Sequence, residues 1–496
     1  MRQTGAPGTG SLSLRFLERF RIPFARGFTW VLGICLLFLG AQIVLRSHSI
    51  KYPGAMIVVG MVVSFFMSLR DKYTFTIFAV GFTLPFFVEF IFVQRDTQVL
   101  AVTGSCLIIL VLAVLGFGTS VFNRQRLLGC RAISMTFALF LCAGLASMVN
   151  TSDRLLSLIA LEREAETWLV FVVMINALKE VKHVITFISG LFVGFGIECV
   201  IFVIQNILGF SFDILGNTRV EGRTDVEAGR IGFQRGTFGA SPHTAAEYFV
   251  VLTLLMVGVY LCSRRLPVRL NPLLGIIAGG ACVVLAAKRA PLGGFAIGLM
   301  LIWGLVAKRA PGALRRLAPL LAAMAIPVLV LLPLLWLRTH QDYEGAYEER
   351  MNLTRVAWDM YHAHPVVGVG AGTYDTIKRE YLPDDWKGWL YTVHNRYLLV
   401  TAETGTLGIA TLLLLYANVL SMAVRGISKI DRNYRPLQIA LVGIFAAFYW
   451  EMLWHMFDSK QQGYLFWFMA ALAFVLPRVL PEGQVNANAT AIEART

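Results

Sequence analysis

Charged residues are scarce in this sequence. Only 15% of its 496 residues are Asp, Glu, Lys or Arg, whereas 57% are hydrophobic. Because soluble domains carry about 25% charged residues, this composition excludes an ordinary soluble domain and indicates a polytopic membrane protein. The net charge is +14, but no basic low-complexity tail or nucleic-acid-binding motif accompanies it. We therefore expect no nucleic-acid partner and attribute the basic excess to loops held on the cytoplasmic side.

Cysteine is absent from the two long polar stretches of the chain, 210–239 and 338–396. The seven cysteines lie in apolar runs or in short basic loops, so we expect neither a disulfide framework nor a cysteine metal site. A cleavage site of small residues is also lacking after the first apolar run. The basic segment 1–27 is therefore expected to be a cytoplasmic tail that leads into a retained helix.

Long apolar runs make up most of the chain. A membrane-spanning helix needs roughly 20 mostly apolar residues, which here predicts an all-α polytopic integral membrane protein with about 12–14 transmembrane helices. The sixth run is the weakest, because "LEREAETW" interrupts its first half. Those charges lie at the outer interface, or the segment is an interfacial helix. The candidate spans are 28–45, 53–69, 73–93, 98–121, 131–148, 157–178, 183–208, 240–262, 271–287, 290–307, 317–337, 397–423, 436–457 and 462–480.

Loop charges orient these spans. With the N-terminus inside, the short cytoplasmic loops carry an excess of Lys and Arg, as the positive-inside rule requires. Both long polar stretches then fall on the outer side. The predicted order is a cytoplasmic tail (1–27), N-terminal transmembrane helices (28–209), an outer loop (210–239), transmembrane helices (240–337), a large outer loop (338–396), C-terminal transmembrane helices (397–480) and a cytoplasmic tail (481–496).

The large outer loop has two recognisable parts. Tyr347, Met351, Val356 and Met360 recur at roughly helical intervals, which predicts an amphipathic helix near the membrane face. The segment "HPVVGVGAGTY" comes next, and its proline and glycines predict a tight turn. A backbone nest for an anion at these glycines is a weaker alternative.

Three costly residues lie at or just inside a membrane boundary on the outer side: Arg235, Arg289 and His394. A charged side chain at the centre of a membrane helix costs about 2.5–3.5 kcal/mol on insertion scales, so such residues usually face a polar cavity or a partner. The planar arginine fork fits phosphate oxygens, and histidine accepts a proton near neutral pH. Their co-occurrence predicts a phosphate or diphosphate site with His394 as a general base.

Each of these residues also has a structural alternative. Arg235 and Arg289 fit anchors that snorkel to the lipid headgroups, and His394 alone fits a boundary histidine with satisfied hydrogen bonds. The other basic residues of the clusters are expected to be anchors or solvated charges: Lys288, Lys378 and Arg396.

Four further ionisable residues accompany the polar clusters. His243 and His455 are expected to be structural. Glu198 and Glu403 lie inside predicted spans, where each needs a partner. We expect a structural hydrogen bond from Glu198 and a site-shaping role for Glu403.

Five short motifs resemble the O-antigen ligase and polymerase superfamily, whose members are polytopic bacterial enzymes that handle lipid-linked glycans. The motifs are "RGTFGASPH" (235–243), "KRA" (288–290), "HPVVGVG" (364–370), "HNRYL" (394–398) and "ETGTLG" (403–408). Their order and spacing match the family from about 190 to 425. The last two motifs are specific when they occur together.

The resemblance implies a GT-C-like glycosyltransferase architecture in the bacterial inner membrane, with the active site facing the periplasm. The donor would be a glycan on undecaprenyl diphosphate, and the acceptor another glycan or lipid A–core. Arg235 and Arg289 would bind the diphosphate and stabilise the leaving group, while His394 would take the proton of the attacking hydroxyl. The supporting residues would be Asn395, Tyr397, Glu403, Arg355 and Arg230.

No metal or cofactor is expected from this resemblance, because the arginines would neutralise the diphosphate. The outer loops also lack an Asp-x-Asp pair for a divalent ion. Their "PDDW" at 383–386 has adjacent carboxylates, which fit a solvated turn.

Several functions remain open at this point. A polymerase, an O-antigen ligase and a protein O-oligosaccharyltransferase share these motifs. A transporter or flippase for the same lipid-linked glycans is the alternative from another class. Transporters tend to place ionisable groups near the membrane midplane and to show repeats, whereas the candidate groups here crowd the outer face. A shared outer-facing site for Arg235, Arg289 and His394 would favour transfer chemistry.

Overall fold

The computed structural model describes residues 66, 68–86, 89–95, 98–122, 127–208, 234–237, 241–262, 266–268, 270–316, 319–320, 346–382, 386 and 391–482. The chain divides into two compact units, Met1–Phe75 and Thr76–Thr496, and the second unit holds the helix bundle. The predicted span 28–45, most of spans 53–69 and 317–337, most of the loop 210–239 and Arg230 lie outside the described residues.

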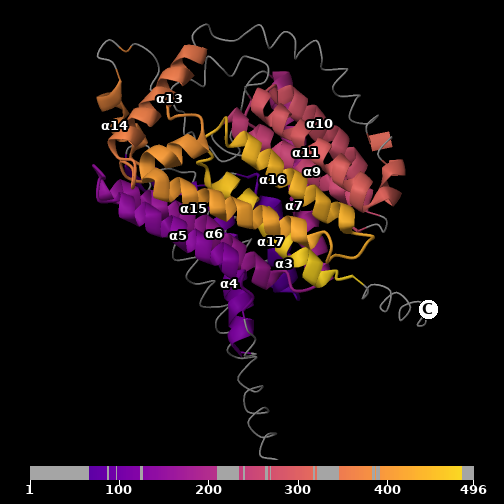
Figure 1. Cartoon of the computed structure of the whole chain (residues 1–496). Helices are drawn as coiled ribbons and strands as arrows, with labels where there is room; N and C mark the ends of the chain where they lie inside the picture. Colours follow the sequence, from indigo (N-terminus) through magenta and orange to yellow (C-terminus); the bar gives the residue numbers. More distant parts are fainter. Residues whose placement is uncertain are drawn as a thin grey trace, which may run out of the picture. The chain divides into compact units, whose positions relative to one another are not determined.

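Helices make up most of the described structure (Figure 1). The long ones are α4 (Gly104–Phe122), α5 (Arg131–Ser147), α6 (Arg154–Ala177), α7 (Val181–Leu208), α9 (Pro242–Leu261), α10 (Pro272–Ala286), α11 (Arg289–Arg309), α13 (Ala346–Ala363), α15 (Arg396–Gly426), α16 (Arg435–Glu451) and α17 (Lys460–Val479). The shorter elements are α3 (Lys72–Thr83), η1 (Pro311–Arg316), α14 (Tyr374–Ile377) and η2 (Lys378–Tyr381), together with strands β1 (Glu89–Arg95) and β2 (Gln98–Thr103).

Five of the described helices are long and apolar enough to cross a membrane: α7, α9, α11, α15 and α17. This confirms a predominantly helical, multi-pass membrane protein. The predicted span 157–178 exists as the helix α6, but its charges keep it outside that set. Its acidic residues reach into the helix bundle, since Glu166 pairs with Lys460 and accepts a hydrogen bond from Tyr464, both on α17.

The predicted spans 73–93 and 98–121 were wrong at their adjacent ends, because residues 89–95 and 98–103 form strands and not helix. Strands β1 and β2 form an antiparallel hairpin there, with Glu89 opposite Thr103 and Arg95 opposite Gln98. Strand β2 is tied to the start of α17, because the ammonium of Lys460 donates to the carbonyl of Ala101 at 2.6 Å. Helix α4 begins directly after the hairpin.

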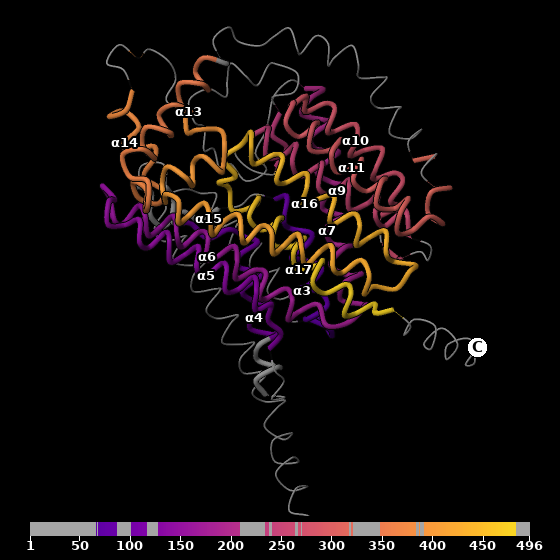
Figure 2. Tube along the Cα trace, viewed as in Figure 1, coloured from indigo at the N-terminus to yellow at the C-terminus, as the bar shows by residue number. Residues whose placement is uncertain are grey.

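Small residues allow the helices to pack closely. A Cβ added at Gly443 of α16 would lie 2.7 Å from the carbonyl oxygen of Gly298 in α11, and one at Gly258 of α9 would lie 2.5 Å from Ala440 in α16. Close backbone approach of this kind is typical of helices that associate in membranes. Figure 2 shows α9, α10 and α11 side by side on one flank, with α5 and α6 on the other and α15, α16 and α17 between them.

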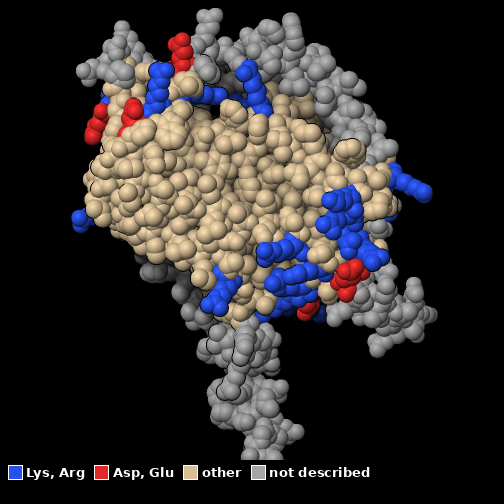
Figure 3. Space-filling view, in the orientation of Figure 1, with Lys and Arg blue, Asp and Glu red and all other residues tan. Residues whose placement is uncertain are grey.

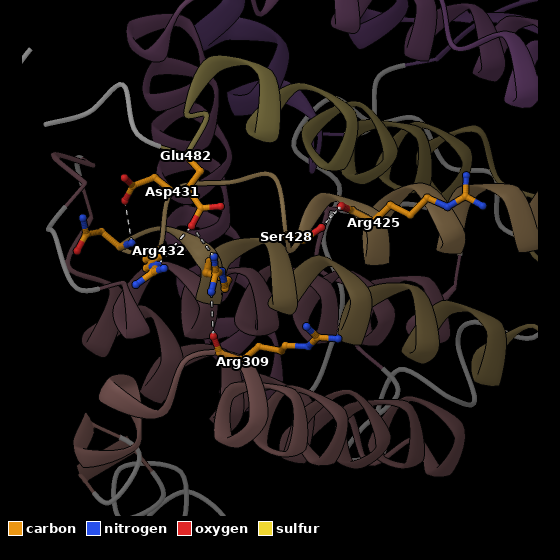
Figure 4. Close-up of polar contacts among 8 residues, drawn as sticks. Arg309, Arg425, Ser428, Asp431, Arg432 and Glu482 are labelled. Atoms are coloured by element: carbon orange, nitrogen blue, oxygen red, sulfur yellow. Dashed lines mark hydrogen bonds and ion pairs between the residues drawn. The ribbon is translucent and has the colours of Figure 1, made fainter. Parts of the chain in front are cut away.

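Basic residues gather at one end of this bundle. Figure 3 shows a broad surface without charged residues between a group of Lys and Arg side chains at the lower right and a mixed charged group at the top. In the close-up of the basic end, the guanidinium of Arg432 donates to Glu482 at 3.3 Å, and that of Arg435 to the carbonyl of Arg309 at 3.3 Å (Figure 4). Arg425 ends α15 at the same place. This is the end for which the loop charges predict a cytoplasmic location.

The predicted amphipathic helix is confirmed as α13. Its inner face buries Val356, Ala357 and Met360 against Val369 and Tyr374 of the following turn. Met351 is 40% exposed, so the buried face differs from the predicted one at that position.

Candidate active site

The glycine turn after α13 is docked onto a break in α15. The amide N–H groups of Val369 and Gly370 donate to the carbonyls of Ala402 and Glu403 at 3.0 and 2.9 Å. At the break, Gly405 has φ 63° and ψ −163°, and a Cβ there would lie 2.4 Å from the carbonyl oxygen of Val366. This backbone conformation is open essentially only to glycine. The motifs "HPVVGVG" and "ETGTLG" are therefore the two halves of one backbone junction.

Helix α15 doubles back at this junction. Tyr397 and Tyr416 are 19 positions apart in the chain, which would separate them by about 28 Å along a straight helix. Their ring centroids are instead 6.3 Å apart. Both also contact α16, because the hydroxyl of Tyr397 donates to the carbonyl of Tyr449, whose own hydroxyl donates to the carbonyl of Tyr416. The predicted span 397–423 lies within α15, which is long and apolar enough to cross a membrane. Its predicted continuity was wrong, because Gly405 divides α15 into a short first helix, residues 396–404, and a longer second one. We refer to the first as the re-entrant helix.

The fold of α15 carries His394 into the bundle. His394 lies just before the re-entrant helix, and Asn395 caps that helix by accepting from the amide of Leu398 at 3.0 Å. The Nδ1 atom of His394 lies 2.9 Å from the carbonyl oxygen of Thr392. A carbonyl can only accept, so in the neutral ring Nδ1 carries the proton and Nε2 is free to act as the base.

Burial lowers the pKa of His394 below its usual value, and the positive charge of Arg350 lowers it further. The Thr392 carbonyl, Asp458 and Asp375 oppose this shift. The imidazole is therefore neutral at neutral pH, which is the form that a general base needs.

A cluster of cationic and imidazole groups surrounds His394. The rings of His243 and His455 are stacked, with centroids 4.4 Å apart and an interplanar angle of 5°. His394, Lys288 and Arg350 all act electrostatically on His243. Four parts of the chain thus come together: the start of α9, the start of α13, the turn between α10 and α11, and the entry to α15.

The same neighbourhood keeps His455 neutral. Burial lowers the pKa of His455 to about 4, Asp458 opposes this, and His394 lowers it further. Its Nδ1 atom accepts from the amide of Phe457 at 3.2 Å. His455 therefore lies at the site as a neutral ring, stacked on His243.

The start of the re-entrant helix is fixed by a buried ion pair. The Nη2 atom of Arg396 lies 2.6 Å from Oε1 of Glu164 on α6, and the arginine is only 6% exposed. Its backbone amide donates to the carbonyls of Met452 and His455 at 2.8 and 3.1 Å. The prediction of Arg396 as an anchor or solvated charge was wrong.

Lys378 was also predicted as an anchor or solvated charge, and this too was wrong. Its ammonium lies 2.7 Å from Oδ1 of Asp375 and the residue is 6% exposed. The other carboxylate oxygen of Asp375 accepts from the hydroxyl of Thr392. This pair therefore braces the stretch of chain that leads to His394.

Arg235 and Arg289 lie at the same end of two parallel helices. Phe195 and Cys199 of α7 contact Gly279 and Cys282 of α10 in the same order. Further along α7, Gln205 holds Gly236, which follows Arg235, through a pair of hydrogen bonds. Arg289 follows α10 after the short turn at Ala287, whose φ is 49°. The exposed Arg289 stands next to Lys288, which links it to the histidine cluster.

The predicted structural role of Glu198 is confirmed. Its carboxylate accepts from the backbone amide of Thr237 at 2.6 Å and from the hydroxyl of the same residue. Gly236, with φ 61°, leaves no room for a side chain beside Glu198. Glu198 therefore shapes the turn that presents Arg235.

The predicted supporting residues fall into two groups. Asn395, Tyr397 and Glu403 hold the re-entrant helix, and the carboxylate of Glu403 accepts from the backbone amides of Gly372 and Tyr374. The predicted glycine turn is thus confirmed. Its backbone amides bind the carboxylate of Glu403, which takes the place of the external anion considered as the alternative. Arg355 instead points from the exposed face of α13 to Asn352.

Sequence comparison finds a known family over part of the chain. Residues 274–413 match the family model described as O-antigen ligase. The chain is similar to the O-antigen ligase family over this segment. The match confirms the resemblance drawn from the motifs, and it includes Arg289, the glycine turn, His394 and the break at Gly405. Arg235 lies before it. No curated protein matches the chain.

The O-antigen ligase match and the apolar helices together indicate a multi-pass membrane enzyme of the ligase or polymerase type. Enzymes of this family use lipid-linked glycans in a membrane environment. Sequence reasoning missed Glu164 and Arg350 as neighbours of the site. Only the charges in "LEREAETW" signalled that α6 needs polar partners within the bundle.

Proposed function

We propose that this protein is a glycosyltransferase that moves a glycan from undecaprenyl diphosphate to an acceptor hydroxyl at the periplasmic face of the inner membrane. The observation that carries the proposal is the position of His394. Its neutral ring lies near the cation Arg350. Lys288, which Arg289 follows in the chain, acts electrostatically on the neighbouring His243. A base next to a cationic site suits the transfer of a group away from a diphosphate.

The proposed reaction is a single displacement. Nε2 of His394 takes the proton of the acceptor hydroxyl while its oxygen forms a bond to the anomeric carbon. The bond from that carbon to the diphosphate oxygen breaks, and its electron pair stays on the diphosphate. Arg235 and Arg289 stabilise the negative charge that develops there. One displacement inverts the configuration at the anomeric carbon.

Polymerase and ligase reactions differ only in the acceptor. A polymerase joins the glycan to another lipid-linked repeat, whereas a ligase joins it to lipid A–core. An assay of the purified protein in proteoliposomes distinguishes the two reactions. The protein receives its native lipid-linked repeat, either with or without lipid A–core. A ladder from the lipid-linked repeat alone identifies a polymerase, and product that needs lipid A–core identifies a ligase.

The role of His394 is tested in the same assay. His394→Ala should abolish transfer, because it removes the Nε2 atom that takes the proton of the acceptor hydroxyl, while the protein remains inserted and folded. His362→Ala is the matched control, because His362 is exposed on α13, where it stacks on neighbouring rings of the same helix. Full activity of His394→Ala would remove it as the base.

A further inference from the structure

Exposed basic side chains cluster at the end of the bundle for which the loop charges predict a cytoplasmic location. In the described part of the chain they lie at the end of α11, on η1 and around the end of α15: Lys308, Arg309, Arg315, Arg425 and Lys429. We call these five residues the basic rim. The start of α16 lies beside the rim, because the guanidinium of Arg435 donates to the carbonyl of Arg309.

The side chains of the basic rim make no ion pair with any other described residue. The nearby carboxylate of Glu482 is already engaged, because it pairs with Arg432 and Arg435 at 3.3 and 3.4 Å. Figure 4 shows the side chains of Arg309 and Arg425 pointing away from Glu482. Within the described chain, the positive charges of the rim are therefore left for a ligand from outside.

Buried cations at the opposite end of the bundle are paired instead. Three of them hold elements of the fold together: Arg396 with Glu164, Lys378 with Asp375, and Lys460 with Glu166. The side chains of these three cations are at most 7% exposed. The exposed rim holds no such contact among the described residues, so packing does not account for it.

An apolar surface adjoins the basic rim. On α11, Met300 and Trp303 are 63% and 58% exposed, and on α15 Val424 is 46% exposed. Trp303 precedes Arg309 by six positions, which is about 9 Å along a helix. Tryptophan at such a distance from a basic helix end is typical of the boundary between lipid headgroups and acyl chains. Figure 3 shows the broad uncharged surface next to the basic group at the lower right.

We propose that the basic rim binds anionic phospholipids of the cytoplasmic leaflet, with their phosphates on the rim and their acyl chains beside Trp303. Guanidinium groups donate to phosphate oxygens, and clustered Lys and Arg at the cytoplasmic end of membrane helices attract anionic lipids. A soluble anion would be recognised by the charges alone, whereas a phospholipid uses both the charges and the apolar border. This inference does not depend on glycosyl transfer, because it concerns the other end of the bundle.

Native mass spectrometry of the purified protein in detergent tests the proposal. It gives the Kd of the first bound lipid for dioleoylphosphatidylglycerol and, as the zwitterionic reference, for dioleoylphosphatidylcholine. The wild type should bind the anionic lipid at least about twentyfold more tightly. Arg309→Gln/Arg425→Gln should weaken binding of the anionic lipid about twentyfold, at about fivefold for each charge removed, and leave binding of the zwitterionic lipid unchanged.

Two further variants separate recognition of charge from other effects. Arg309→Lys/Arg425→Lys keeps both charges and should retain most of the affinity for the anionic lipid. Arg154→Gln/Arg379→Gln removes two exposed charges at the end that holds the glycine turn, and should leave that affinity unchanged.

Several results would overturn the proposal. Equal Kd values for the two lipids in the wild type would exclude a preference for anionic headgroups. An unchanged Kd in Arg309→Gln/Arg425→Gln, or an equal loss in the lysine variant or in Arg154→Gln/Arg379→Gln, would exclude recognition by the charges of the rim. Displacement of the lipid by an equal concentration of soluble glycerol phosphate would identify a free anion as the ligand instead.

Discussion

The buried ion pair between Glu164 and Arg396 makes a quantitative prediction about stability. The Glu164 side chain is 25% exposed and that of Arg396 is 7% exposed. Removing one partner of a buried pair costs about 3–5 kcal/mol, because it leaves the other charge uncompensated. Glu164→Gln leaves the charge of Arg396, the more deeply buried partner, and this guanidinium keeps its hydrogen bond to the Tyr416 hydroxyl. We expect it to lower the free energy of unfolding by about 3 kcal/mol, the low end of that range.

The double variant should cost less than the two single variants together. Arg396→Gln leaves Glu164, which keeps partial contact with water, so its cost should be about 2 kcal/mol. Glu164→Gln/Arg396→Gln leaves no charge behind and should cost about 2 kcal/mol rather than the additive sum of about 5. The coupling energy of the cycle is then about 3 kcal/mol.

Equilibrium unfolding of the four proteins by steric trapping in bicelles measures this cycle. The exposed pair Arg432 and Glu482, 3.3 Å apart at the basic end, provides a control cycle with a coupling energy of at most about 1 kcal/mol. If the losses of unfolding free energy in the Glu164 and Arg396 single variants sum to the loss in the double variant, the pair does not fix the re-entrant helix. The reasoning from burial then fails.

Other predictions concern the base and the junction that positions it. Transfer requires neutral His394, so the rate should be full at neutral pH and fall on acidification below the usual histidine pKa of about 6.5, because burial and Arg350 lower the pKa of His394. Arg350→Gln removes the neighbouring positive charge and should move this acid limb to higher pH in a pH–rate profile; an unmoved limb would exclude His394 as the titrating group. Gly405→Ala should lower the free energy of unfolding by at least about 2 kcal/mol, because its φ of 63° is strained for alanine and its Cβ would meet Val366. Gly304→Ala, in open space on α11, should instead stabilise the helix by about 0.5–1 kcal/mol, and equal effects of the two changes would contradict the junction.

Periodicity predicted the elements whose structure is locally determined. The apolar runs gave α5, α7, α9 and α11 within a few residues, and the helical spacing of Val356 and Met360 gave α13. The hairpin of β1 and β2 was missed because a short apolar run such as "EFIFV" fits a buried helix as well as a strand. Hydropathy therefore identifies burial more securely than it identifies the element.

Contacts between distant residues could not be predicted in this way. The break at Gly405 depends on a turn that begins 40 positions earlier at Pro365, and Arg396 finds its partner 232 positions away at Glu164. Each residue alone fitted a simpler interpretation, a continuous span or a solvated charge. The motifs predicted which polar residues form the site, but the re-entrant geometry that carries His394 into the bundle depends on the tertiary contacts.

The most direct test of glycosyl transfer is the balance between bonds formed and carrier lipid released. Purified protein in proteoliposomes receives its native undecaprenyl-diphosphate-linked repeat, and both free undecaprenyl diphosphate and new glycosidic bonds are quantified. The account predicts one undecaprenyl diphosphate released for each bond formed, with inverted anomeric configuration, and neither product with His394→Ala. Movement of the intact lipid-linked glycan across the bilayer, without release of undecaprenyl diphosphate, would contradict it and identify a transporter.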